Sequence, residues 1–134
     1  GVEQEAVELA KKQGILKRLI FIGRTIQNPL VRKNIKAASL TAETAAVANN
    51  MAEFSAALSE PDADWVYVRY LPTRSEMQQV HAAGKKSFIA GSSVSGNVPQ
   101  NWQQATVAGI DAILTDYPLA LRALQQQSQL KSDD

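Results

Sequence analysis

A helix that ends at a glycine and leads into a short apolar run occurs three times in this chain. The glycines are Gly14, Gly84 and Gly109, and the runs that follow them are residues 19–22, 87–90 and 112–114. Glycine readily adopts the positive φ that ends many helices, and short runs rich in β-branched and aromatic residues are typical of strands. The repeat therefore predicts helices alternating with strands, and such strands pair in parallel through right-handed crossovers.

The rest of the chain continues this alternation. We expect strands at residues 19–22, 35–40, 65–70, 87–90 and 112–114. We expect helices at residues 2–13, 29–33, 41–58, 74–83, 99–108 and 119–127. The helix at 41–58 is predicted from its alanine-rich composition and from Thr41 as N-cap, and the helix after Thr73 from a capping box with Glu76. Together the elements form one α/β domain over residues 1–130, followed by a polar tail at residues 131–134.

Five such units are compatible with two closures of the sheet. One is an open, flavodoxin-like sheet, and the other is the second part of an eight-stranded (β/α)₈ barrel, which needs about 250 residues when complete. The residues alone favour the open sheet, because a partial barrel leaves two strand edges unpaired.

Composition excludes several kinds of chemistry. The 134 residues include no cysteine, so disulfides, a thiol nucleophile and cysteine metal sites are excluded, while the compartment stays open. The formal net charge of +1 gives no electrostatic reason to expect nucleic acid or an anionic membrane surface. No apolar run approaches the roughly 20 residues that cross a bilayer. Because the sequence begins with Gly1 rather than Met, we expect that the natural N-terminus lies upstream.

Candidate binding residues lie where the predicted strands end, since ligands of parallel α/β sheets sit at the C-terminal ends of the strands. Two arginines and a Gly/Ser-rich loop on one rim suit an anion such as phosphate, which accepts bidentate hydrogen bonds from guanidinium and backbone N–H groups. The alternative is that the arginines are solvated loop residues, and no spacing matches a P-loop. The candidate residues are Arg24, Arg69, Gly91, Ser92, Ser93, Asn97 and Asp116.

Catalytic candidates are few. His81 is the only histidine, and its place near the end of a predicted helix puts it opposite the expected site, so no Ser-His-Asp set can form. Among the acids only Asp116 is predicted at the C-terminal end of a strand, and one carboxylate does not make a divalent-cation site. Asp116 also suits a structural role in starting the last helix. We therefore assign no catalytic and no metal-binding residue, and we expect Trp65, Trp102, Met51 and Met77 to be packing residues.

The end of the chain resembles the glycerophosphodiester phosphodiesterase family. The similarity is carried by Ala83-Gly84 before the strand at 87–90 and by the closing segment at 109–118, which has the sequence GIDAILTDYP. In that family an Ala-Gly helix end precedes the seventh strand, and a Gly-Val-Asp-Gly-Ile-Thr-Asp-x-Pro type segment forms the eighth. The similarity of the remaining chain is weaker and generic to α/β proteins.

The resemblance implies strands four to eight of a (β/α)₈ barrel that hydrolyses glycerophosphodiesters with Ca²⁺ or Mg²⁺ and takes part in lipid metabolism. The family's catalytic His-Arg pair, Glu-x-Asp pair, second His and further metal-ligand Glu lie on the first three barrel units, so none is carried over. By match only Thr115, Asp116 and Pro118 transfer. The family's Trp-Thr-Val-Asn at the seventh strand is replaced here by residues 89–92, IAGS, which puts the usual aromatic wall in doubt.

On this resemblance we expect a partial barrel that binds no cofactor itself and is inactive alone. It would supply the substrate side of a pocket for a phosphodiester small molecule when the N-terminal part is present. Its open sheet edges predict a homo-oligomer. The alternative is a non-catalytic module, either a self-associating half-barrel or a flavodoxin-like interaction or anion-binding protein.

Overall fold

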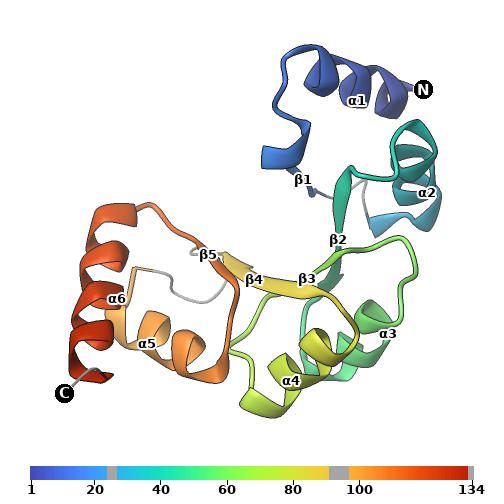
Figure 1. Cartoon of the computed structure of the whole chain (residues 1–134). Coiled ribbons are helices and arrows are strands. Elements are labelled where there is room, and N and C mark those ends of the chain that lie inside the picture. Colours follow the sequence, from blue (N-terminus) through green and yellow to red (C-terminus); the bar gives the residue numbers. More distant parts are fainter. Residues whose placement is uncertain (24–26, 91–96, 133–134) are drawn as a thin grey trace.

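The computed structural model describes residues 1–23, 27–90 and 97–132, and its five parallel strands follow one another across the sheet in chain order (Figure 1). The strands are β1 (Ile20–Phe21), β2 (Glu43–Ala48), β3 (Trp65–Val68), β4 (Lys86–Ala90) and β5 (Ala112–Leu114). The helices are α1 (Val2–Lys12), α2 (Pro29–Ala38), α3 (Phe54–Leu58), α4 (Arg74–Ala82), α5 (Pro99–Ala108) and α6 (Pro118–Ser132). Two 3-10 turns, η1 (Leu16–Arg18) and η3 (Met51–Glu53), complete the described elements.

The sheet curls, with the helices on its outer side and its inner face open (Figure 1). The strand order β1-β2-β3-β4-β5 is that of consecutive barrel units, whereas a flavodoxin-like sheet has the order 2-1-3-4-5. The predicted partial barrel of alternating strands and helices is therefore confirmed.

Side chains alternate between the two faces of the sheet, as the two-residue period of a strand requires. The outward-facing residues pack against α3, α4 and α5 in the largest core cluster, which includes Val66, Val68 and Ile89. The inward-facing set lies on the inner face and is centred on Ala45, Trp65 and Phe88. A third cluster joins α1, α2 and β1.

The predictions for residues 35–53 are wrong, whereas the helix expected as far as Leu58 is present from Phe54. Helix α2 starts at Pro29, capped by the side chain of Asn28, and continues to Ala38 where a strand was expected; Ile35 is buried on its inner side. The expected helix at 41–58 is instead strand β2 followed by η3 and the short α3. Pairing with both β1 and β3 overrides the helix propensity of the alanines, because small side chains fit a strand buried between two packed layers.

Local signals at the helix ends are confirmed. Gly14, Gly84 and Gly109 have φ of 70°, 72° and 104°, which only glycine adopts readily. Thr73 and Glu76 form the predicted capping box of α4. Helix α6 continues past the predicted end at Gln127 to Ser132.

Three of the four predicted packing residues are buried. Trp65, Trp102 and Met77 lie in the interior, whereas Met51 is 63% exposed in η3. In the portion of the chain that the structure describes, no helix has the length and hydropathy needed to span a membrane.

Candidate functional site

The predicted anion-binding residues that the structure describes lie in the connections that follow three different strands. Arg69 follows β3, Asn97 lies between β4 and α5, and Asp116 follows β5. Parallel strands bring these positions to one rim of the sheet. The other predicted residues, Arg24, Gly91, Ser92 and Ser93, lie outside the described residues. Residues 39–41 do not lie on this rim, because the strand expected at 35–40 is absent and these residues follow α2 and precede β2.

Arg69 is held on this rim by Asn49, and Asn49 is held in turn by Glu53. Sequence reasoning missed both of these residues. Nη1 of Arg69 donates a 3.0 Å hydrogen bond to Oδ1 of Asn49, and its backbone N–H donates to the carbonyl of Ala48 at 2.9 Å. The backbone N–H and Nδ2 of Asn49 both donate to Oε2 of Glu53 at 2.8 Å. These two bonds hold the pKa of Glu53 below its ordinary value, since they favour the carboxylate form.

The turn after β3 is fixed by a second carboxylate, that of Glu76. Its Oε1 accepts from the backbone N–H of Thr73 at 2.9 Å, and its Oε2 accepts from the hydroxyl of Tyr70 at 2.5 Å. Partial burial, together with the hydrogen bond and charge of Glu76, raises the pKa of Tyr70. This cluster shapes the rim and uses the groups of the capping box itself, so its role is structural.

Asp116 lies exposed beyond β5, next to the start of α6. It is the Thr115 hydroxyl that accepts the N–H of Tyr117, at 3.1 Å, in a short turn before Pro118. The predicted link between this segment and the start of the last helix therefore runs through Thr115. The anion-binding role of Asp116 stays a prediction.

The inner face below the rim carries an aromatic layer. Tyr67 stacks on Phe88 with ring centroids 4.7 Å apart, and Trp65 meets Phe88 edge-on at 6.0 Å. Nε1 of Trp65 donates to Oε2 of Glu43 at 2.7 Å, and Nζ of Lys86 lies 5.5 Å from the indole centroid. These rings form a floor beneath the strand ends.

Strands β1 and β5, at opposite edges of the sheet, border one apolar cavity of about 260 Å³. Ile20 and Ile22 approach it from the β1 side, and Ala112 and Leu114 from the β5 side, with Phe88 between them. Strands four positions apart lie opposite each other in an eight-stranded barrel, whose interior is just wide enough for side chains to fill. The curvature is thus that of such a barrel.

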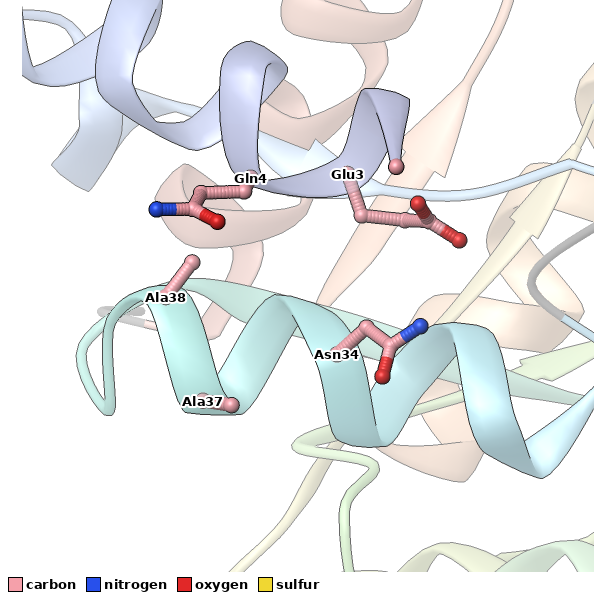
Figure 2. Close-up of a pocket in the computed structure, with 6 residues that line it drawn as sticks. Glu3, Gln4, Asn34, Ala37 and Ala38 are labelled. Carbon is pink, nitrogen blue, oxygen red and sulfur yellow. The ribbon is translucent and has the colours of Figure 1, made fainter.

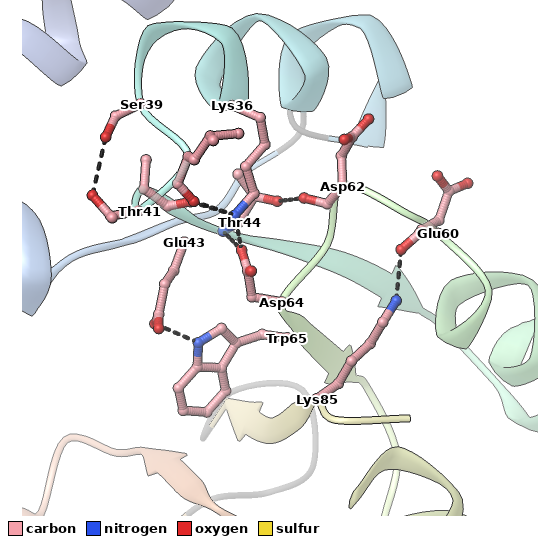
Figure 3. A network of polar contacts seen from close by, with 12 residues as sticks. Lys36, Ser39, Thr41, Glu43, Thr44, Glu60, Asp62, Asp64, Trp65 and Lys85 are labelled. Atoms are coloured by element: carbon pink, nitrogen blue, oxygen red, sulfur yellow. Dashed lines mark hydrogen bonds and ion pairs between the residues drawn. The ribbon is translucent and has the colours of Figure 1, made fainter. Parts of the chain in front are cut away.

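The opposite end of the sheet holds a polar network (Figure 3). Oδ2 of Asp64 accepts from Nζ of Lys36 at 2.6 Å and from the N–H of Thr44 at 3.0 Å. The Thr44 hydroxyl donates to the carbonyl of Asp62, and Nζ of Lys85 donates to the carbonyl of Glu60 at 2.6 Å. Burial lowers the pKa of Lys85. Such a network at the N-terminal ends of barrel strands serves stability.

His81 belongs to that same end. It lies in the last turn of α4, and its Nε2 is 2.9 Å from Oδ2 of Asp111, at the start of β5. The same oxygen accepts the N–H of Ser87 at 2.8 Å. The position of His81 opposite the rim, predicted from the sequence, is confirmed.

Two polar clefts lie among the helices rather than on the open inner face. One of about 300 Å³ separates α1 from α2 and is lined by Glu3, Gln4 and Asn34, with alanines at its base (Figure 2). The other, of about 330 Å³, lies between α2 and α3, where Arg32 and Glu60 pair at 2.7 Å. Neither contains a constellation of reactive groups.

Comparison with known proteins identifies the fold. The sequence matches no family model and no curated protein. Among solved structures, the chain matches one described as a glycerophosphoryl diester phosphodiesterase from Silicibacter pomeroyi, with a TM-score of 0.71 and 13% identity. The match covers 94% of this chain and 44% of the other.

This is part of an eight-stranded (β/α)₈ barrel fold. The predicted resemblance to that family is borne out at the level of structure, and the match is consistent with a C-terminal part. The chain spans less than half the length of the solved phosphodiesterase.

The donor set does not fit the divalent metal that the resemblance implies for an intact member. Within residues 1–23, 27–90 and 97–132, no group of three or more His, Asp or Glu side chains is placed to hold a metal ion. The carboxylates of Asp64, Glu76 and Asp111 are engaged with backbone N–H groups and neighbouring side chains. What the described rim offers is a guanidinium held by hydrogen bonds, which is the chemistry of anion binding.

Proposed function

We propose that this chain is the C-terminal portion of a phosphodiester hydrolase of the glycerophosphodiester phosphodiesterase type. The observation that carries the proposal is the structural match, which covers nearly all of this chain and less than half of the solved phosphodiesterase. The barrel curvature supports it, since β1 and β5 border one cavity as opposite strands of an eight-stranded barrel do. Three further strands would complete such a barrel.

In this proposal the chain supplies the substrate side of the pocket. Arg69 binds the phosphodiester at the rim, and residues 91–97 shape the space for the alcohol group. The metal, Ca²⁺ or Mg²⁺, and the groups that activate water are supplied by the three missing units. The chain alone is then inactive, because hydrolysis by these enzymes needs a metal-held nucleophile that the described residues cannot assemble.

An activity assay tests this division of labour. The purified 134-residue chain is incubated with a glycerophosphodiester and Ca²⁺ or Mg²⁺, and the released alcohol is measured. We expect no turnover. The protein encoded by the longer reading frame, which includes the coding sequence upstream of Gly1, is assayed beside it. We expect its upstream part to contain His-Arg followed by Glu-x-Asp. We expect this longer protein to hydrolyse the diester until a chelator is added. Chelator-sensitive turnover by the short chain would refute the assignment of the chemistry to the missing units.

A second candidate is a self-associating half-barrel without catalytic function. It is favoured by the two sheet edges, since β1 and β5 each pair with a single neighbour among the described strands. Light scattering of the purified chain, combined with the hydrolysis assay of the longer protein, distinguishes the two proposals. A discrete oligomer together with an inactive longer reading frame would favour the non-catalytic module.

A further inference from the structure

The guanidinium of Arg69 is positioned from two directions. Its backbone is pinned to Ala48 on β2, and its side chain is bound to Asn49 through Nη1. Arg69 continues the alternation of Trp65 and Tyr67, the residues of β3 that face the inner side of the sheet. It therefore lies above the aromatic layer, at the end of the sheet where parallel α/β proteins bind ligands.

The orientation of Asn49 is itself determined by Glu53. An asparagine amide has a donor side and an acceptor side, and a carboxylate can only accept. Because Nδ2 and the backbone N–H of Asn49 both donate to Glu53, the carbonyl oxygen Oδ1 must point the other way, where it meets Arg69. Glu53 is fixed in turn by the side chain of Asn50, which accepts its backbone N–H at 3.2 Å. Asn49 directly follows β2, Glu53 lies in η3, and Arg69 directly follows β3.

We propose that Asn49 and Glu53 are positioning residues that hold the Arg69 guanidinium ready for a phosphate oxyanion at the C-terminal rim of the sheet. The inference rests on the proposed function and names the residues that prepare its anion site. A guanidinium carries five N–H donors in one plane and can match two phosphate oxygens at once. Fixing its rotamer before the anion arrives removes part of the entropy loss on binding.

The charge of Glu53 and its hydrogen bonds to Asn49 should have opposite effects on the affinity for phosphate. A carboxylate near an anion site repels the anion, so a purely electrostatic Glu53 would weaken phosphate binding. As the residue that orients Asn49, it would instead strengthen binding. The two roles predict opposite signs for one substitution.

The experiment titrates the purified chain with inorganic phosphate and with glycerol 3-phosphate and follows backbone and guanidinium NMR signals. We expect saturable binding, lost in Arg69→Ala and retained in Arg122→Ala, which removes the same charge from an exposed site on α6. Both Glu53→Ala and Glu53→Gln remove a negative charge, but glutamine keeps an oxygen that accepts from Asn49. We expect Glu53→Ala and Asn49→Ala to weaken binding by roughly three- to tenfold, as loss of one fixed side-chain conformation predicts. Glu53→Gln should bind at least as tightly as the wild type.

Two results would overturn the positioning role. The first is equal tightening in both Glu53 variants, and the second is an Arg69→Ala chain that binds phosphate as the wild type does. A wild-type chain that binds neither ligand also overturns it, while the activity of the longer reading frame decides the proposed function separately. The dispersion of each variant's NMR spectrum confirms folding, and Glu5→Gln on the exposed face of α1 controls for net charge.

Discussion

Asp64 and Asp111 occupy equivalent places in the sheet, one before β3 and the other before β5. Each carboxylate accepts the N–H of the second residue of the preceding strand, from Thr44 at 3.0 Å and from Ser87 at 2.8 Å. The backbone N–H of each aspartate also donates to the carbonyl of that same strand residue, from Asp64 to Thr44 at 3.0 Å and from Asp111 to Ser87 at 3.1 Å. Each carboxylate is paired with a basic side chain on the helix before that strand, Lys36 on α2 or His81 on α4. The strand pairs β2–β3 and β4–β5 are thus joined by the same device at their N-terminal ends.

We expect Asp64→Ala and Asp111→Ala to lower the free energy of unfolding by about 1–3 kcal/mol each, the cost of leaving such donors without an acceptor. The effect should be larger at Asp64, because the ammonium group of Lys36 is left largely buried without its counter-charge. Urea denaturation followed by circular dichroism measures both. Asp62→Ala is the matched control, since Asp62 enters the network through its backbone carbonyl. A control as destabilised as Asp64→Ala would contradict a specific role for the carboxylate.

The hydrogen bond between Tyr70 and Glu76 should make stability depend on alkaline pH. The pKa of Tyr70 is raised above its ordinary value of 10.0 by partial burial and by Glu76. The folded state then holds the proton more tightly than the unfolded state. This contribution is fully present below pH 10 and is lost as the pH rises from there toward the higher pKa of the folded state.

Tyr70→Phe tests this linkage. We expect the variant to be less stable than the wild type by about 1.5–3 kcal/mol near pH 8, through loss of one hydrogen bond to a charged group. The difference should shrink above pH 10, where only the wild type loses this contribution. Unfolding free energies of both proteins over a range of alkaline pH provide the measurement. A constant difference across the range would mean that Tyr70 titrates alike in both states.

The sequence predicted most of the architecture because its strongest signals are local. A positive-φ glycine at each of three helix ends and the capping box at Thr73 depend on neighbouring residues alone, and the structure confirms them. Strand β2 could not be found this way, since alanines favour a helix and only pairing with β1 and β3 makes residues 43–48 extended.

In the candidate site, too, the residue with a local sequence signal was predicted and those that depend on contacts between strands were missed. Arg69 could be placed on the rim because β3 has a clear sequence signal and the residue follows it directly. Asn49 and Glu53 were missed, because residues 41–58 were assigned to one helix and the contact between Asn49 and Arg69 exists only across a strand pair. The sequence does carry one signal for this turn, which is Asn50 three residues before Glu53. Asparagine is a favoured N-cap residue, and Asn50 caps η3, so this spacing could have predicted that a new helical turn begins here.

The hydrogen bonds from Asn49 to Glu53 predict a measurable change in acidity. The backbone and side-chain N–H groups of Asn49 hold the pKa of Glu53 below its ordinary value of 4.5. Asn49→Ala removes the side-chain donor and frees the turn, so we expect the pKa to rise toward 4.5. An NMR titration of the Glu53 carboxyl carbon, in the wild type and in the variant, measures it. An unchanged pKa in the variant would show that the side-chain hydrogen bond from Asn49 does not contribute to the lowered pKa of Glu53.

Among the described strands, β1 and β5 each pair with a single neighbour, and we therefore expect that the isolated chain associates with itself. Unpaired edge strands offer N–H and C=O groups to another chain, and the edge strand β5 also exposes Leu114 by 59%. Light scattering at several protein concentrations should show a discrete oligomer, and Leu114→Lys should shift it toward the monomer, because a charged lysine at an edge disfavours pairing. Leu119→Lys is the matched control: it places the same charge on an equally apolar, exposed position of α6, away from the strand. Dispersal by both variants would place the contact on the helix face instead, and a wild-type chain that is monomeric at every concentration would contradict edge pairing.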